Sequence, residues 1–144
     1  MRTVPAMDMT IHQSFLPHRD PDASVAFYTD VLGFEVRLDV GDGEMRFITV
    51  GPPNQPDTSI VLQPPTADPS ISDTERATIL AMMDKGTFAG VNLATPDLDA
   101  AFERIEAAGA DVVQEPIDQA TPPSRRTWQR CPPGRARSDA TSTN

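Results

Sequence analysis

Residues 27–34, Phe27-Tyr28-Thr29-Asp30-Val31-Leu32-Gly33-Phe34, decide the fold because they join an expected helix to an expected strand. Asp20-Pro21 opens this helix. Asp20 can accept a hydrogen bond from the first turn, and Pro21 suits the first helical position, where a missing N–H costs nothing. Gly33 is a typical left-handed stop. The stretch therefore predicts a short helix that ends just before a strand.

The residues around this helix predict a module of one strand, one helix and three further strands. Their alternation of apolar and polar residues favours strands at 10–16, 34–40, 45–50 and 58–63. Gly41-Asp42-Gly43 indicates a hairpin turn between the second and third strands. Within residues 10–16, Ile11, Gln13 and Phe15 point to one face and their neighbours to the other.

Residues 90–112 repeat the beginning of this pattern. A shift of 77 positions aligns Asp20 with Asp97 and Tyr28 with Ile105, and the second helix is one residue shorter before Gly109. Between the copies, the Ser72-x-x-Glu75 capping box predicts a connecting helix. Its expected inner face comprises Thr78, Ile79, Met82 and Met83, and Gly86 is its expected end.

The C-terminal residues do not continue the repeat. Residues 120–144 contain no Val, Ile, Leu or Phe, and they hold five Arg and one Asp. Such a segment buries too little apolar surface to offset the entropy lost on ordering. A shifted reading frame beginning near Gln119 would produce a sequence of this composition. The expected organisation is a disordered lead-in (1–9), a first module (10–65), a helical connector (66–87), a truncated second module (88–117) and a disordered or atypical basic tail (118–144).

Composition excludes several classes of protein. The net charge is −9, and because the tail carries +4 the remainder carries −13, which disfavours binding to nucleic acid. No apolar run reaches the roughly 18 residues that a membrane span needs. The N-terminus shows no signal-peptide pattern, and Cys131 is the only cysteine. We therefore expect a cytoplasmic protein without an internal disulfide or a membrane partner.

The Phe27-Tyr28-x-x-Val31-Leu32-Gly33-Phe34 pattern, together with the repeat, resembles the vicinal oxygen chelate superfamily of glyoxalases, bleomycin-resistance proteins and extradiol dioxygenases. The resemblance covers roughly residues 9 to 117. It implies an α+β fold of paired βαβββ modules whose sheets curl around a cavity, with an incomplete second module here. It also implies a homodimer, since binding proteins of this superfamily typically complete their cavities by dimerising.

The resemblance also locates the superfamily's metal-ligand positions, and these carry a poor set of donors. They fall on Gln13, on Val61 where an acid is expected, and on Gly90 where His or Glu is expected. The fourth ligand would come from a final strand that the tail does not predict. One neutral amide is too few donors for a divalent ion, so we expect no cofactor, with a divalent metal as the alternative.

We therefore predict a protein that binds a small molecule between its modules, through Gln13, Phe15, Val61, Gln63 and Asn92. These residues describe a mixed apolar and amide-lined pocket, and the acidic charge would favour cationic ligands. Gln13 could equally pair with a neighbouring strand. The alternatives are a metal-dependent lyase, isomerase or dioxygenase of the same superfamily, and an inactive, damaged copy. No catalytic residue is predicted.

Three polar side chains outside this set have simpler interpretations. His12 is expected to be a hydrogen-bonded structural residue that faces the helix layer or a sheet edge. His18 precedes the helix cap and is expected in a surface loop. Arg46 is the one cation on an expected inner strand, and we expect it to be exposed to solvent.

Overall fold

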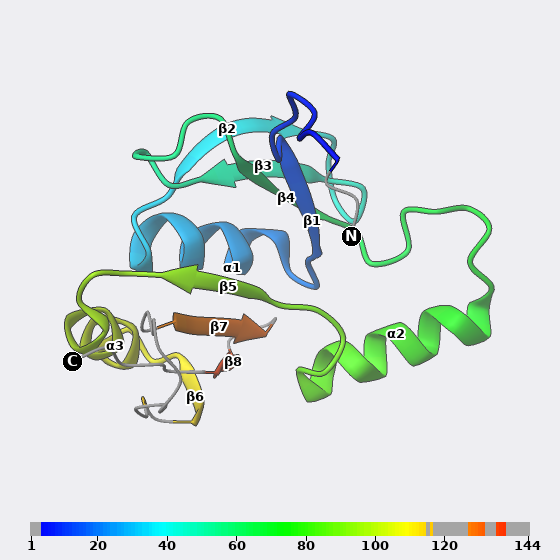
Figure 1. Cartoon of the computed structure of the whole chain (residues 1–144). Coiled ribbons are helices and arrows are strands. Elements are labelled where there is room, and N and C mark those ends of the chain that lie inside the picture. The colour runs from blue at the N-terminus through cyan, green and yellow to red at the C-terminus, as the bar shows by residue number, and fades with distance from the viewer. Residues whose placement is uncertain (1–3, 115, 117–126, 132–134, 138–144) are drawn as a thin grey trace.

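The computed structural model describes residues 4–114, 116, 127–131 and 135–137. It is an α+β fold with two four-stranded sheets, and each sheet has its own helix (Figure 1). The predicted fold class is confirmed. None of the helices among these residues is long and apolar enough to cross a membrane.

The first module contains a mixed sheet in the order β1-β4-β3-β2. β1 pairs with β4 in parallel, and the other neighbours are antiparallel. A register irregularity between Val36 and Leu38 interrupts the pairing of β2 with β3. The strands are β1 (Gln13–Pro17), β2 (Glu35–Val40), β3 (Phe47–Gly51) and β4 (Ser59–Gln63).

The first helix begins and ends where its sequence predicts. The Asp20 carboxylate accepts a hydrogen bond from the Ala23 backbone N–H at 3.2 Å, and Gly33 adopts a left-handed φ of 78°. The helix consists of α1 (Pro21–Ala26) followed by a π-helical turn, η1 (Phe27–Val31). A π-turn accommodates one additional residue in a helix. This is the residue by which the first helix exceeds its counterpart in the second module.

The second module begins like the first. It contains β5 (Val91–Ala94), α3 (Leu98–Ala107) and β6 (Asp111–Gln114). The Asp97 carboxylate accepts a hydrogen bond from Ala100 N–H at 3.0 Å, and Gly109 has a φ of 83°. The two helices therefore share both their N-terminal cap and their glycine stop, as the repeat predicts.

The second sheet then departs from the first. Its last strands are β7 (Thr127–Cys131) and β8 (Arg135–Arg137), and its order is β5-β7-β8-β6. β5 pairs antiparallel with β7 and β6 pairs parallel with β8, so the last two strands have exchanged the places that the first module assigns them. The expectation that the tail forms no regular element was wrong for the backbone of β7 and β8, since strand pairing needs no apolar side chains. The rest of 118–144 lies outside the described residues.

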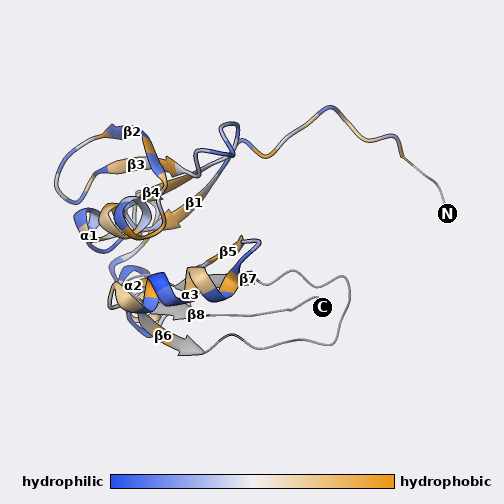
Figure 2. Cartoon of the chain, turned by 90° about the vertical axis from the view of Figure 1, so that its left-hand side faces the viewer, coloured by the Kyte–Doolittle hydropathy of each residue, from blue (hydrophilic) through white to orange (hydrophobic). Residues whose placement is uncertain are grey.

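One hydrophobic core joins the two modules. On the first module it takes side chains from one face of the sheet and from the first helix, and on the second from α3: Leu16, Phe27, Tyr28, Ile48, Val50, Leu62, Leu98 and Ile105. Val91 and Leu93 of β5 pack against it. α1 lies between the first sheet and β5 in both views (Figures 1 and 2). The other face of the first sheet therefore points away from the second module.

The aromatic residues of the 27–34 stretch form the centre of this core. The Phe27 and Tyr28 rings meet edge to face, with centroids 5.6 Å apart, and Phe34 lies 5.6 Å from Tyr28 on the other side. Aromatic pairs of this kind add to the stabilisation that burial alone provides. The stretch that predicts the helix end thus also supplies the ring cluster that holds the helix on the sheet.

The connector forms α2 (Asp73–Lys85). The Ser72 hydroxyl accepts a hydrogen bond from Glu75 N–H and donates one to the Glu75 carboxylate, so the capping box is confirmed. Met83 is fully buried, whereas Thr78 and Met82 are exposed, so the predicted inner face was too wide. The helix lies beside the domain and buries only a narrow stripe.

Candidate functional site

The open face of the first sheet, which we define as the face opposite α1, presents apolar side chains to solvent. Strand register places Leu38, Thr49, Val61 and Phe15 side by side across the four strands. Leu38 is 55% exposed and Phe15 is 52% exposed. Between them, Val61 is only 7% exposed, so the exposed apolar side chains lie on the two edge strands. Exposed apolar surface on a soluble protein is typical of a binding site.

Four of the five predicted binding residues share this face. Gln13, Phe15, Val61 and Gln63 alternate along β1 and β4, and Phe15 is the register partner of Val61. Asn92 does not join them. It lies on β5 between Val91 and Leu93, which pack on the shared core, so its exposed side chain points away from that core on the other sheet.

Arg37 borders the open face and was not predicted from the sequence. Its guanidinium donates hydrogen bonds to the carbonyls of Thr58 (2.6 Å), Pro52 (2.9 Å) and Gln55 (3.0 Å), to the Ser59 hydroxyl (2.7 Å) and to the Glu35 carboxylate (3.2 Å). These contacts tie β2 to the loop between β3 and β4. All the donor nitrogens are engaged, so Arg37 shapes the edge of the face and has no donor left for a ligand. Only the glycine at position 51, beneath it, hints at such a contact in the sequence.

A second arginine cluster lies at the opposite end of β2 and β3. Arg46 pairs with Asp39 at 2.7 Å and with Asp22 at 2.6 Å. The hydrogen bond from Arg46 holds the pKa of the Asp39 carboxyl below its ordinary value. Arg46 is only 23% exposed, so the expected solvent-exposed arginine is instead largely covered by its ion pairs.

His18 is buried, and the expectation of a surface loop residue was wrong. The side chain is 2% exposed. Its Nε2 lies 2.6 Å from the carbonyl oxygen of Arg46, and its backbone N–H donates to the Gln63 carbonyl. These two bonds hold the turn before α1 against the β2–β3 connection and the end of β4. His12, by contrast, is exposed just before β1.

The residues at the implied metal positions do not fit a divalent ion. Gln13 offers one neutral amide oxygen, Val61 offers no donor, and Gly90 has no side chain and precedes β5. Within the described part of the chain, no three His, Cys, Asp or Glu side chains are grouped so that they could hold a metal ion. Divalent metals of this superfamily's chemistry need several N or O donors. The face is therefore suited to contacts with apolar and amide groups.

The chain belongs to the glyoxalase/bleomycin resistance protein/dioxygenase superfamily, whose profile matches residues 10–125. This match confirms the resemblance carried by residues 27–34 and the repeat. None of the curated proteins compared with the chain matches it.

Comparison with solved structures agrees with this family. The chain is similar to UcmS2, with 31% identity over 93% of this chain and all of that one, and a TM-score of 0.72. It shares its fold with TnmS3, an antibiotic binding protein from Streptomyces sp. CB03234 (22% identity, 96% and 100% coverage, TM-score 0.64). A superfamily member from Sphaerobacter thermophilus DSM 20745 is also similar (24% identity, 95% of this chain and 100% of that chain covered, TM-score 0.62).

Proposed function

We propose that this protein is an antibiotic-binding member of the superfamily. It binds a small, largely apolar molecule on the open face of its first sheet. The exposed side chains of Phe15 and Leu38 on the two edge strands carry this proposal, because burying such side chains against a ligand is favourable and leaving them in water is not. Gln13, two positions before Phe15 on β1, and Gln63, two positions after Val61 on β4, supply amide groups that would orient the ligand. The fold shared with an antibiotic binding protein supports the same class of ligand.

A second copy of the chain would complete the site. The open face points away from the second module, so one chain cannot enclose a ligand there. A homodimer would cover the exposed apolar side chains of Leu38, Val40 and Phe15, and would turn an open face into a cavity. The negative charge of residues 1–119 would favour cationic ligands in that cavity.

We further propose that binding needs no metal. Gln13 is the only donor among the three implied ligand positions within the described residues. Metal analysis after purification without chelators tests this, and a stoichiometric divalent ion would refute it. Retained binding after dialysis against a chelator is the expected result.

Two matched pairs of variants test the site. A panel of cationic aromatic antibiotics serves as probes in titration calorimetry. Phe15→Ala should weaken binding by about 10-fold or more, since it removes a large contact surface. Phe88→Ala, which truncates a phenylalanine that is 39% exposed outside the face, should leave binding unchanged. Equal effects of the two variants, or no binding of any probe, would contradict the proposal.

The dimer is tested separately by light scattering. Leu38→Glu should shift the mass from dimer to monomer, because it places a charge in the covered surface. Met82→Glu, an exposed apolar position on α2, should not do so. A monomeric wild-type protein at all concentrations would refute the dimer.

The order of the second sheet supports a second candidate, an inactive copy with an altered C-terminus. β7 and β8 occupy exchanged positions, and the superfamily profile ends at residue 125. The coding DNA tests this candidate. If no alternative frame after Gln119 encodes an alternating apolar strand, the altered-frame explanation is wrong.

A further inference from the structure

The segment before β1, residues 4–12, which we call the N-terminal arm, carries the most exposed large apolar side chains of the described residues. Val4 and Met7 are each 77% exposed, Ile11 is 73% exposed and Met9 is 71% exposed. The arm projects away from the rest of the domain (Figure 2). A group of apolar side chains in water is unfavourable, so the arm is expected to be covered by another apolar surface.

Among the residues that the structure describes, the first sheet holds the arm only at its base. The Ile11 carbonyl accepts a hydrogen bond from the Thr58 hydroxyl, and the His12 carbonyl accepts one from the Ser59 N–H, both at 3.0 Å. Within the same described part of the chain, no hydrogen bond joins residues 4–10 to the body of the domain. Residues 4–10 are therefore available to another molecule.

The reach of the arm favours a second copy of the chain over its own sheet as the covering surface. To cover its own sheet, the arm would have to reverse direction before Ile11, whose carbonyl is fixed. A tight turn takes about four residues, so about three of residues 4–10 would remain, with a reach of roughly 10 Å. Crossing the open face from β1 to β2 takes roughly 14 Å at the usual spacing of strands. An arm that continues straight out of its own chain reaches roughly 30 Å.

The pattern of the arm matches the open face of a second copy. Alternate residues of an extended chain share a side, so Met7, Met9 and Ile11 form one apolar row when the arm is extended. The open face leaves apolar side chains exposed on its two edge strands. Methionine side chains adapt to irregular apolar surfaces of this kind. Packing the row against this face removes both apolar surfaces from water.

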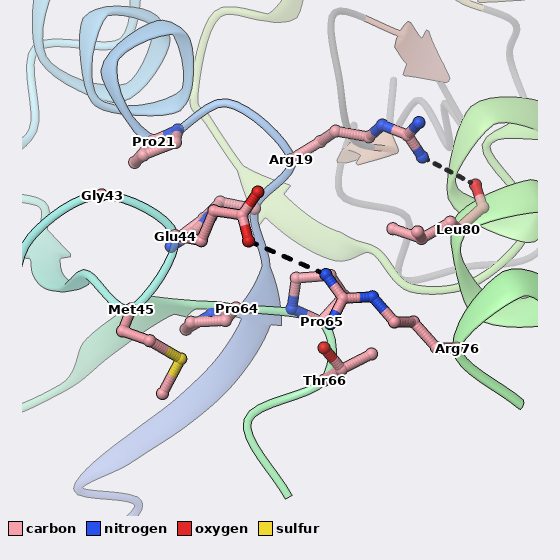
Figure 3. Close-up of a pocket in the computed structure, with 11 residues that line it drawn as sticks. Arg19, Pro21, Gly43, Glu44, Met45, Pro64, Pro65, Thr66, Arg76 and Leu80 are labelled. Carbon is pink, nitrogen blue, oxygen red and sulfur yellow. Dashed lines mark hydrogen bonds and ion pairs between the residues drawn. The ribbon is translucent and has the colours of Figure 1, made fainter. Parts of the chain in front are cut away.

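A pocket elsewhere on the chain suits the arm less well. It has a volume of about 440 Å³ and lies between α2 and the end of the first sheet (Figure 3). Arg76 and Glu44 face one another in its lining, at 3.9 Å, and Arg19 donates a hydrogen bond to the Leu80 carbonyl at 3.3 Å. An apolar segment placed there would remove these charged groups from water without new partners, which is unfavourable. The open face is therefore the better match.

We propose that the N-terminal arms are exchanged between two copies of the chain, each arm packing across the open face of the other copy. Met9 and Ile11 of one copy then form part of the wall of the cavity on the second copy, so each binding site takes side chains from both chains. This inference rests on the dimer proposed above and adds to it the segment that closes the site.

Photo-crosslinking in the full-length chain tests where the arm lies. Met9 is replaced by p-benzoylphenylalanine, which keeps the side chain apolar, and equal amounts of ¹⁵N-labelled and unlabelled protein are mixed until their chains have exchanged. After irradiation, mass spectrometry should find the arm of one isotopic form joined to residues 13–17, 35–40 or 47–51 of the other. The same photoreactive residue in place of Met82 on α2 should give no crosslink to these strands.

Replacement of the apolar row measures its contribution to the dimer. In the combined variant Met7→Ser, Met9→Ser and Ile11→Ser, the dissociation constant of the dimer should rise by at least about 10-fold in analytical ultracentrifugation, because three buried apolar side chains are lost. The matched variant Met82→Ser with Phe88→Ser, which alters exposed apolar residues elsewhere, should change this constant by less than about 2-fold. All these positions are exposed in the single chain, so both variants should keep the wild-type circular dichroism spectrum.

The outcomes separate the arm from the dimer. A wild-type protein that is monomeric at all concentrations would refute both. A wild-type dimer whose dissociation constant is unchanged by the three serine substitutions would refute the arm exchange alone. Crosslinks that never join the two isotopic forms, or that join the arm to the pocket around Leu80, would likewise refute the exchange and leave the dimer standing.

Discussion

Replacement of Arg37 by Met should destabilise the protein more than any other change of a single charged residue on the first sheet. The guanidinium is largely buried, with its side chain 17% exposed, and it donates to three backbone carbonyls and to the Ser59 hydroxyl. Methionine preserves much of the stem but supplies no donor. The acceptors at Thr58 and Ser59, both covered by the sheet, would then lose their partners.

The expected loss of unfolding free energy can be estimated from these hydrogen bonds. A hydrogen bond from a charged donor contributes about 1.5–3 kcal/mol, and acceptors that water can reach recover much of it. The Pro52 and Gln55 carbonyls lie in the exposed loop, so mainly the bonds to Thr58 and Ser59 are lost. The expected cost is about 3 kcal/mol. For a chain of this size, that lowers Tm by about 10 °C.

Substitution of Gly51 tests the hydrogen bonds of Arg37 independently. A Cβ built at Gly51 would lie 2.4 Å from Nη1 and 2.6 Å from Cζ of Arg37. Gly51→Ala should therefore push the guanidinium from its acceptors, at a cost similar to that of Arg37→Met. Because both changes break one set of bonds, the double variant should lose much less than the sum of the two.

Urea unfolding followed by circular dichroism measures these differences. Arg46→Met is the matched control, since the Arg46 guanidinium also donates several hydrogen bonds, three of them to the Asp39 and Asp22 carboxylates. Water can solvate these carboxylates when the guanidinium is removed. Its loss should be less than half that of Arg37→Met. Equal losses at the two arginines, or strict additivity of Arg37→Met with Gly51→Ala, would refute the reasoning.

Three further predictions concern the core, the connector and acid stability. Ile48→Ala, at a fully buried position, should cost about 3–4 kcal/mol in urea unfolding, whereas Val4→Ala, at a position that is 77% exposed, should stay within about 0.5 kcal/mol. Ser72→Ala should cost about 1 kcal/mol by the same assay, because α2 loses its cap. Asp39, whose pKa is lowered by the hydrogen bond from Arg46, stabilises the fold above its unfolded pKa of about 3.9, and this is lost as pH falls through the folded pKa. Asp39→Asn should therefore flatten the loss of stability below about pH 4, measured as urea midpoints against pH, and an unchanged acid limb would contradict this.

The helices and the first sheet follow from the sequence because their signals are local. Asp20, Asp97 and Ser72 each cap the helix that their spacing predicts. The alternation along β1 and β4 likewise places Phe15 and Val61 on one face. Each of these inferences needs only the geometry of a single element or of one strand pair.

The parts that the sequence did not predict depend on contacts between distant segments. Arg37 bonds to Thr58, 21 positions away, and His18 bonds to Arg46, 28 positions away. Neither the residue type nor its spacing in the sequence shows whether such a side chain has a buried partner or is solvated. The position of Asn92 also depends on how the two modules pack. Its local alternation was interpreted correctly, but the modules pack through their helix sides, so its face and the face of Phe15 do not meet.

The repeat is informative because its two copies differ by one residue. Both helices keep an Asp cap and a glycine stop, so an additional residue between these points must be absorbed inside the helix. The first copy absorbs it as the π-turn at Phe27–Val31, and the second, without it, has none. This turn carries Phe27 and Tyr28, the two rings that fix the helix on the sheet. The length difference thus has a structural role in the core.

Binding at the open face should depend on protein concentration. The open face points away from its own second module, so a ligand there is enclosed only when a second copy covers it. Below the dissociation constant of the dimer, ligand binding at the open face should therefore weaken in proportion to the fraction of dimer. Titrations at protein concentrations on either side of that constant measure this. Binding that stays constant on dilution would show that a single chain holds the ligand without a second copy.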